Sequence, residues 1–241
     1  MVYLDSMAEK LAQLKPLKGR HRTFKYYGEE DGLRYKEFLT DYEVMTDPDE
    51  LEETEGKTHR GHEHLIFSNC VANIGEGVML LEITKTARPG RAKVEQCIED
   101  DAKPRVDWKR RAAGSAVFDK NPDHNHWHFA NFLEYRLRRV KTGRVVKEGL
   151  KQSFCLEDIA KIDKTVGRRL FALCPNLRMK TGVMGITPGW GDVYWSGVQE
   201  QYIEVKGLPT GAYWLECVVD PKNRLKVKSR NQNKTRVEIR L

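Results

Sequence analysis

Three histidines at alternate positions are the residues whose types and spacing best suit chemistry. His124, His126 and His128 are three of only seven histidines in 241 residues. On a β-strand, side chains at positions i, i+2 and i+4 share one face, and neutral imidazole is a common ligand of copper and zinc. The spacing therefore predicts that three imidazoles bind one metal ion. Copper and zinc both remain open, because coordination geometry separates them and ligand type does not.

Such a site requires the strand to bend. In a straight strand the outer two Cα atoms lie about 13 Å apart, at ~3.3 Å per residue. Both outer rings reach one ion, with bonds of ~2.0–2.1 Å, only if the chain curves. We therefore expect a bend or bulge in a strand that starts after Pro122. A second group, His59, His62 and His64, borders a loop and is interpreted as a solvated stretch.

The cysteines argue against other kinds of metal site. No C-x-x-C pair occurs among Cys70, Cys97, Cys155, Cys174 and Cys217, which disfavours a zinc ribbon or a redox-active cysteine pair. One or two disulfides are possible, but their pairing does not follow from the sequence. Buried free thiols are an equally good interpretation of any single cysteine.

Short strands separated by turns are the elements that would position these residues. Gly- and Pro-rich turns punctuate the sequence from residue 62 onward, which favours a β-sandwich. The single helix expected in this part covers residues 156–167. The expected strands cover residues 65–71, 78–83, 112–118, 127–140, 150–155, 202–205, 213–219 and 235–241.

The first 60 residues have a different character. A capping box at residues 6–9 predicts a short helix that ends before Pro16, and residues 50–56 are acidic and loop-like. We therefore expect a mainly β protein, a β-sandwich with short helices and long loops. It would consist of a domain over residues 61–241 and an N-terminal extension over residues 1–60, part of which packs on that domain.

Composition limits the classes of partner and compartment. No apolar run approaches the ~20 residues of a membrane-spanning helix, and residues 1–13 lack the apolar segment of a secretory signal. The sequence as it stands thus indicates a cytoplasmic protein or a trimmed form of a longer one. The net charge of +7 invites a nucleic-acid interpretation, which ranks last because the basic stretch 222–234 lacks interleaved aromatic residues.

Several segments, in order and with matching spacing, resemble the lysyl oxidase family. They are Asn125–Phe129, Glu148–Asp158, Gly185–Tyr194, Gln201–Val205, Leu208–Tyr213 and Val219–Pro221. The resemblance covers roughly residues 62–241. Within the family, the sequence resembles the bacterial or archaeal branch most. Cys155 and Cys174 match cysteine positions of the family, whereas Trp190 stands where the secreted animal enzymes have a cysteine.

The resemblance implies a copper-dependent amine oxidase. Copper would bind His124, His126 and His128, and the cofactor lysine tyrosylquinone would form from Lys151 and Tyr194. The enzyme would convert primary amines, either peptidyl lysine or small amines, to aldehydes with O₂ and release H₂O₂ and ammonia. Secretion is normal for the family. The ordinary pKa of lysine is about 10.4, so Lys151 must be desolvated or lie near positive charge to react as a free amine.

Asp192 is the candidate general base. On a strand it would share a face with Tyr194, two residues further on. An equally good interpretation makes Asp192 a turn residue after Gly189 and Gly191. Taken singly, Lys151 would be a surface lysine and Tyr194 a core aromatic residue.

An alternative function is a copper-binding β-sandwich module without quinone catalysis. Such a module would need neither Lys151 nor Tyr194 at the matching positions, so these two residues favour the oxidase.

Overall fold

The protein is built from antiparallel β-sheets. The computed structural model describes residues 64–99, 108–121, 124–176, 181–194, 200–230 and 233–241, together with the backbone of four segments that precede residue 46. These four segments are β1 (Val2–Tyr3), β2 (Arg22–Tyr26), β3 (Lys36–Thr40) and β4 (Tyr42–Met45). No helix occurs within the described ranges, so none there is long and apolar enough to cross a membrane.

The strands from residue 64 onward are short and follow one another closely. They are β5 (His64–Phe67), β6 (Asn69–Asn73), β7 (Met79–Lys85), β8 (Arg91–Glu99), β9 (Trp108–Phe118), β10 (Trp127–Ala130), β11 (Leu133–Arg139), β12 (Val145–Glu148), β13 (Ser153–Phe154), β14 (Ala160–Lys161), β15 (Thr181–Ile186), β16 (Trp190–Tyr194), β17 (Tyr202–Glu204), β18 (Ala212–Val219) and β19 (Lys234–Arg240).

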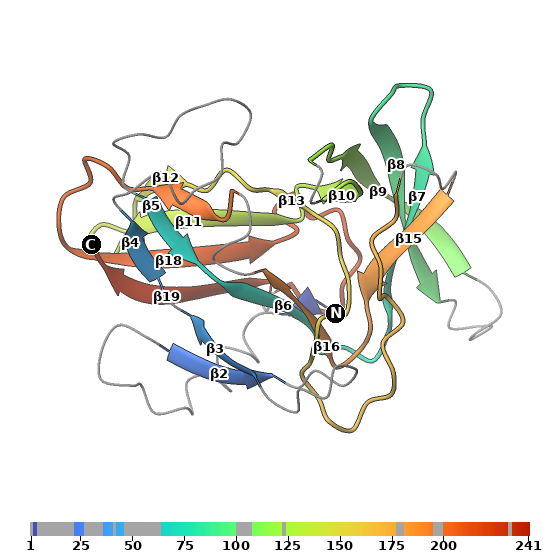
Figure 1. The fold of residues 1–241 in the computed structure, drawn as a ribbon, viewed down its shortest axis with the longest axis horizontal. Helices are drawn as coiled ribbons and strands as arrows, with labels where there is room; N and C mark the ends of the chain where they lie inside the picture. Colours follow the sequence, from blue (N-terminus) through green and yellow to red (C-terminus); the bar gives the residue numbers. More distant parts are fainter. Residues whose placement is uncertain are drawn as a thin grey trace.

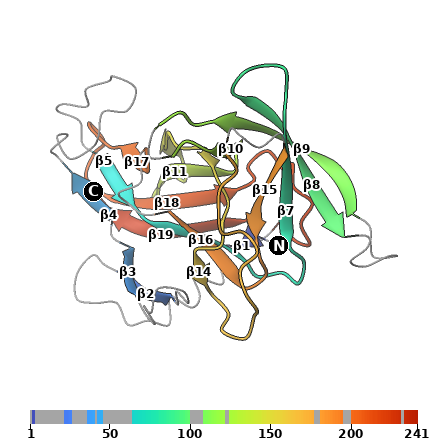
Figure 2. The same cartoon turned by 45° about the vertical axis from the view of Figure 1, so that its right-hand side comes forward.

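Two larger sheets lie toward opposite ends of the molecule, with β6 and β16 between them (Figures 1 and 2). One has six strands in the order β13-β10-β9-β8-β7-β15, and the other has four in the order β12-β11-β18-β19. Strands β6 and β16 are the centre of a further sheet, β1-β6-β16-β14. This arrangement matters for function because β10 and β16 carry candidate site residues from different sheets.

One hydrophobic core joins these sheets. Along β11 the side chains of Leu133, Tyr135 and Leu137 are buried, and the residues between them are partly exposed. This period of two is what a strand with one covered face requires. The same core includes Trp127 of β10 and Tyr194 of β16, so the candidate site is attached to the main hydrophobic core of the described residues.

The mainly β prediction is confirmed, with several antiparallel sheets packed in a sandwich-like manner around this core. The expected strand 127–140 is two strands, because Asn131 has a φ of 58° and breaks the extended chain. Likewise β5 and β6 replace the expected strand 65–71. Strands β8, β12, β14, β15 and β16 lie outside the expected strand ranges.

The helix predicted for residues 156–167 is wrong. The segment holds the short strand β14 and a turn and bend at residues 164–166 in place of a helix, because distant groups satisfy its polar atoms. The backbone N–H groups of Ile159 and Ile162 donate to carbonyls of Gly191 and Gly189. The buried Asp158 carboxylate accepts hydrogen bonds from backbone N–H groups of another loop and of the chain after β15. Tertiary partners thus outweigh the local helical tendency.

Only short backbone segments of residues 1–60 are described. The helix before Pro16 lies outside the described residues. Strand β4 pairs with β5 and β1 pairs with β6, so parts of this region extend sheets of the domain. The division at residue 60 stays a prediction.

Gly185 of β15 provides a test of this packing. A Cβ atom at this position would lie 1.9 Å from the Met79 carbonyl oxygen and 2.8 Å from the Phe171 ring. We expect Gly185→Ala to lower the free energy of unfolding in urea by about 1–3 kcal/mol or more, as overpacking of a core does. Gly77→Ala is the matched control, because a Cβ there meets nothing within 4 Å. Equal stability of the two variants would contradict this account of β15.

Candidate metal and cofactor site

The three predicted histidines converge. Their ring centroids lie between 4.7 and 5.5 Å apart, and the Nε2 atoms of His126 and His128 are 2.8 Å apart. The expectation that all three share one strand is wrong, because β10 begins only at Trp127. The expected bend is present: Asn125 has a φ of 45°, and the backbone N–H groups of His124 and Asn125 both donate to the Asn121 carbonyl. A turn, rather than a straight strand, brings the rings together.

Packing on both sides fixes the start of β10. Trp127 is buried and its ring meets Phe118 of β9 edge-on at 5.3 Å between centroids. Its backbone N–H donates to the Pro175 carbonyl. His128, next in the chain, is only 5% exposed. The segment that carries the three histidines is therefore anchored to the hydrophobic core.

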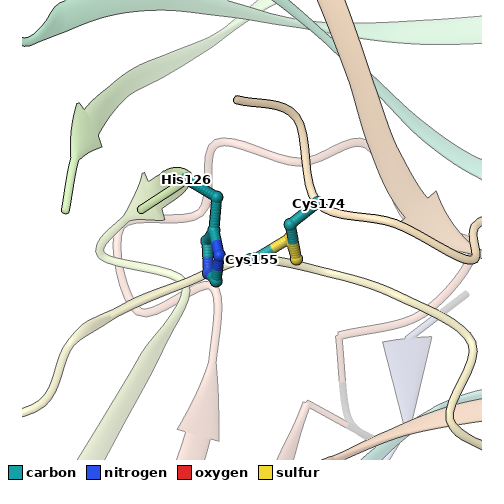
Figure 3. A group of neighbouring side chains, drawn as sticks. All are labelled: His126, Cys155 and Cys174. Carbon is teal, nitrogen blue, oxygen red and sulfur yellow. A yellow bond between two sulfur atoms is a disulfide. The ribbon is translucent and has the colours of Figure 1, made fainter. Parts of the chain in front are cut away.

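A disulfide lies beside this histidine cluster. Figure 3 shows the Cys155–Cys174 bond next to the His126 ring, and the potential ligand atoms of the three residues lie within 4.8 Å of one another. Because the two sulfur atoms are bonded to each other, neither is a thiolate ligand. The structure thus resolves the pairing that the sequence left open. Cys70, Cys97 and Cys217 are free and buried.

Asp119 is a residue of this cluster that the sequence did not reveal. It follows β9, and its Oδ2 lies 2.7 Å from Nδ1 of His124 and 3.6 Å from Nδ1 of His128. The only available signal was an acidic residue five positions before His124, which is common by chance. The pairing of β9 with β10, with Phe118 opposite Trp127, is what places Asp119 beside the histidines.

Asp192 and Tyr194 lie together on β16. The Tyr194 hydroxyl is 2.5 Å from Oδ2 of Asp192 and 3.1 Å from the carbonyl oxygen of Cys155. The prediction that both side chains share a face is confirmed. The interpretation of Asp192 as a turn residue is wrong, because it is inside a strand and accepts a hydrogen bond from the distant backbone N–H of Glu157.

Lys151 is not a surface lysine, because only 6% of it is exposed. Its Nζ lies 5.4 Å from the centroid of the Phe154 ring, and the Tyr194 ring lies 4.5 Å from the same ring. Lys151 and Tyr194 therefore both approach Phe154. The Tyr194 hydroxyl itself bonds to Asp192 and to the carbonyl of Cys155.

Burial sets the protonation of the groups around the histidine cluster. It lowers the pKa of His126 and brings that of His128 to about 3, with further lowering by neighbouring histidines. Burial also lowers the pKa of Lys151, against the opposing charges of Glu200 and Asp119. Neutral imidazoles and an amine that deprotonates more easily are what metal ligation and nucleophilic attack require.

The Asp192–Tyr194 pair responds to burial in the opposite sense. Burial is the main cause that raises the pKa of Asp192 well above its ordinary value; the hydrogen bond from Tyr194 opposes this rise and Glu157 adds to it. Burial and the Asp192 charge raise the pKa of Tyr194. Asp192 is thus a stronger base than an exposed carboxylate.

The second half of the chain matches a known protein family. The lysyl oxidase family model matches residues 109–241, more than half of the chain. The chain belongs to the lysyl oxidase family. The matched range begins later than the expected residue 62 and includes the histidines, Lys151, Asp192 and Tyr194. The affiliation to a bacterial or archaeal branch stays a prediction.

Several animal members of the lysyl oxidase family are similar to this chain. Protein-lysine 6-oxidase of Rattus norvegicus is 31% identical over 140 residues, which cover 58% of this chain and 30% of the rat protein. The Sus scrofa protein of the same name has the same identity, with 49% of its length covered. Lysyl oxidase homolog 3B of Danio rerio is 34% identical over 98 residues, covering 41% of this chain and 11% of that protein. The chain thus spans less than half the length of each.

The second histidine group is not a solvated stretch at His64. This residue is 1% exposed, and its ring meets Tyr202 at 4.4 Å between centroids. His59 and His62 lie outside the described residues.

The pKa of His128 predicts a pH dependence of stability. Between its ordinary pKa of 6.5 and its folded value of about 3, the unfolded chain binds a proton that the folded chain does not. Falling pH in this window therefore destabilises the metal-free protein, by at most ~1.4 kcal/mol per pH unit from this residue. Urea unfolding should show a shallower pH slope for His128→Gln than for the wild type. Identical slopes would contradict the lowered pKa.

Proposed function

We propose that this protein is a copper-dependent amine oxidase of the lysyl oxidase type. The observation that carries the proposal is the convergence of three imidazoles whose ring centroids lie within 5.5 Å of one another. Family membership supports it independently. In this proposal His124, His126 and His128 hold copper, and Lys151 with Tyr194 form lysine tyrosylquinone.

The residues present fit both groups. Three neutral imidazoles are a ligand set that copper accepts, and the lowered pKa values of His126 and His128 keep their lone pairs free of protons near neutral pH. The lysine and the tyrosine that would form the quinone are both buried, which excludes water from the reacting groups.

Copper held by the three histidines would supply, with O₂, the oxidising chemistry that converts Tyr194 and Lys151 to the quinone, and the quinone would supply a two-electron acceptor for a primary amine. Burial of Lys151 favours the uncharged amine that this bond needs. Asp192, which is 2.5 Å from the Tyr194 hydroxyl, would accept the phenol proton first and a substrate proton later. Overall, amine, O₂ and water would give aldehyde, ammonia and H₂O₂.

The substrate and the compartment follow as proposals of the same kind. The relatives named protein-lysine 6-oxidase support a primary amine, either small or within a lysine-containing peptide. Because the net charge is +7, lysines in an acidic context would approach more readily than lysine-rich peptides. The Cys155–Cys174 disulfide supports an oxidising compartment, such as the outside of the cell.

The first test is the visible spectrum of the protein after loading with Cu(II) in air. We expect a quinone band that phenylhydrazine shifts, and we expect it to be absent in Lys151→Met and Tyr194→Phe. The matched controls are Lys161→Met, which removes another buried lysine near an aromatic ring, and Tyr213→Phe, whose buried hydroxyl bonds to Pro209. Both controls should keep the band.

Copper uptake without any quinone band, and without peroxide from amines, would refute the oxidase. The protein would then be a copper-binding module.

Asp192→Asn tests the proton acceptor. In the mature enzyme we expect the anaerobic reduction of the quinone by an amine to slow by about 10²–10⁴-fold, as loss of a general base does. In the wild type this rate should rise with pH through a pKa above the ordinary 3.8 of aspartate, because burial raises that of Asp192. Reduction of the variant at the wild-type rate would exclude Asp192 as the base.

A further inference from the structure

We propose that Asp119 is a positioning residue that orients His124 and His128 through their Nδ1 atoms, which leaves Nε2 of both rings as the metal-binding atom, and that holds His126 through its backbone. The inference rests on the copper half of the proposed function. It concerns a residue outside the histidine motif and outside the Lys151–Tyr194 pair.

Asp119 contacts all three histidine residues. Its Oδ2 lies 2.7 Å from Nδ1 of His124 and 3.6 Å from Nδ1 of His128. Its backbone N–H donates to the carbonyl of His126 at 3.0 Å. A single residue thus meets two of the rings and the backbone of the third histidine.

The contact with His124 determines which ring nitrogen carries the proton. A carboxylate only accepts hydrogen bonds, so Nδ1 of His124 must donate. A neutral ring protonated at Nδ1 has its lone pair on Nε2. An acceptor of this kind, bonded to the ring nitrogen that does not bind metal, holds the orientation of a ligand and raises its basicity.

The ligand atoms of Asp119, His124 and His128 lie within 4.8 Å of one another, but the approach of the histidine Nε2 atoms favours Asp119 as a support for the ligands rather than a ligand itself. The two Nε2 atoms of His126 and His128 approach each other to 2.8 Å. Asp119 instead lies at the Nδ1 edges of His124 and His128. An ion held by Nε2 atoms would therefore use the ring nitrogens that Asp119 does not contact.

The carboxylate of Asp119 is itself held in place. Its Oδ1 accepts a hydrogen bond from the backbone N–H of Asn121 at 3.0 Å. Asp119 also directly follows β9, whose last residue, Phe118, pairs with Trp127. Both carboxylate oxygens thus face N–H donors. An asparagine has one oxygen and one NH₂ group, so it could accept from only one of these donors.

The closing experiment combines two measurements. Nitrogen NMR of the metal-free wild type, labelled in histidine, identifies the protonated nitrogen of His124, and we expect Nδ1. Competition with a chelator then gives the Cu(II) affinity of the wild type, Asp119→Asn and Asp119→Ala. We expect both variants to bind copper about 10–100-fold more weakly, the usual effect of losing such a partner. Glu82→Gln is the control, because it removes a carboxylate that pairs with Arg110 instead.

Each of these measurements can overturn the proposed role of Asp119. A His124 ring protonated at Nε2 in the wild type would overturn the proposal without any variant, so poor folding of a variant does not protect it. Copper affinity of Asp119→Asn within about twofold of the Glu82→Gln value would overturn it as well. A wild type that takes up no Cu(II) would refute the proposed function and this inference together, whereas equal uptake by the wild type and Asp119→Asn would refute the inference alone.

Discussion

The covalent bond between Cys155 and Cys174 is the constraint on which the candidate site depends. Its sulfur atoms lie next to the ring of His126, and the carbonyl of Cys155 accepts from the Tyr194 hydroxyl. One residue therefore connects the histidine cluster with the residue proposed to become the quinone. Cys155 is also part of the main core. Movement of the histidine cluster relative to Tyr194 would therefore disturb packing as well as hydrogen bonds.

Burial, which removes side chains from water, is the common physical cause of the shifted pKa values around the Cys155–Cys174 disulfide. It lowers the pKa of the cationic groups, His128 and Lys151, and raises that of the anionic ones, Asp192 and Tyr194. Both effects favour uncharged forms. The same burial that stabilises the core thus provides free imidazole lone pairs, an amine that deprotonates more easily and a carboxylate of increased basicity.

The site is assembled from several sheets rather than from one loop. His128 lies on β10 of the six-stranded sheet, and Asp192 lies on β16 of a different sheet. Lys151 belongs to the segment between β12 and β13 and touches Phe154 of β13. A substitution far from the chemistry can therefore act on the site through the packing between sheets.

The sequence by itself determined the histidine trio, the need for a bend near it and the mainly β class, because spacing and alternation are local properties. The resemblance carried by its motifs selected Lys151 and Tyr194, and the period of two along a strand selected Asp192. The tertiary structure alone decided the partner of Cys155, the place of Asp119 beside the histidines and the non-helical form of residues 156–167. Each of these depends on groups that are distant in the chain or on the register between two strands, and no local pattern encodes such contacts.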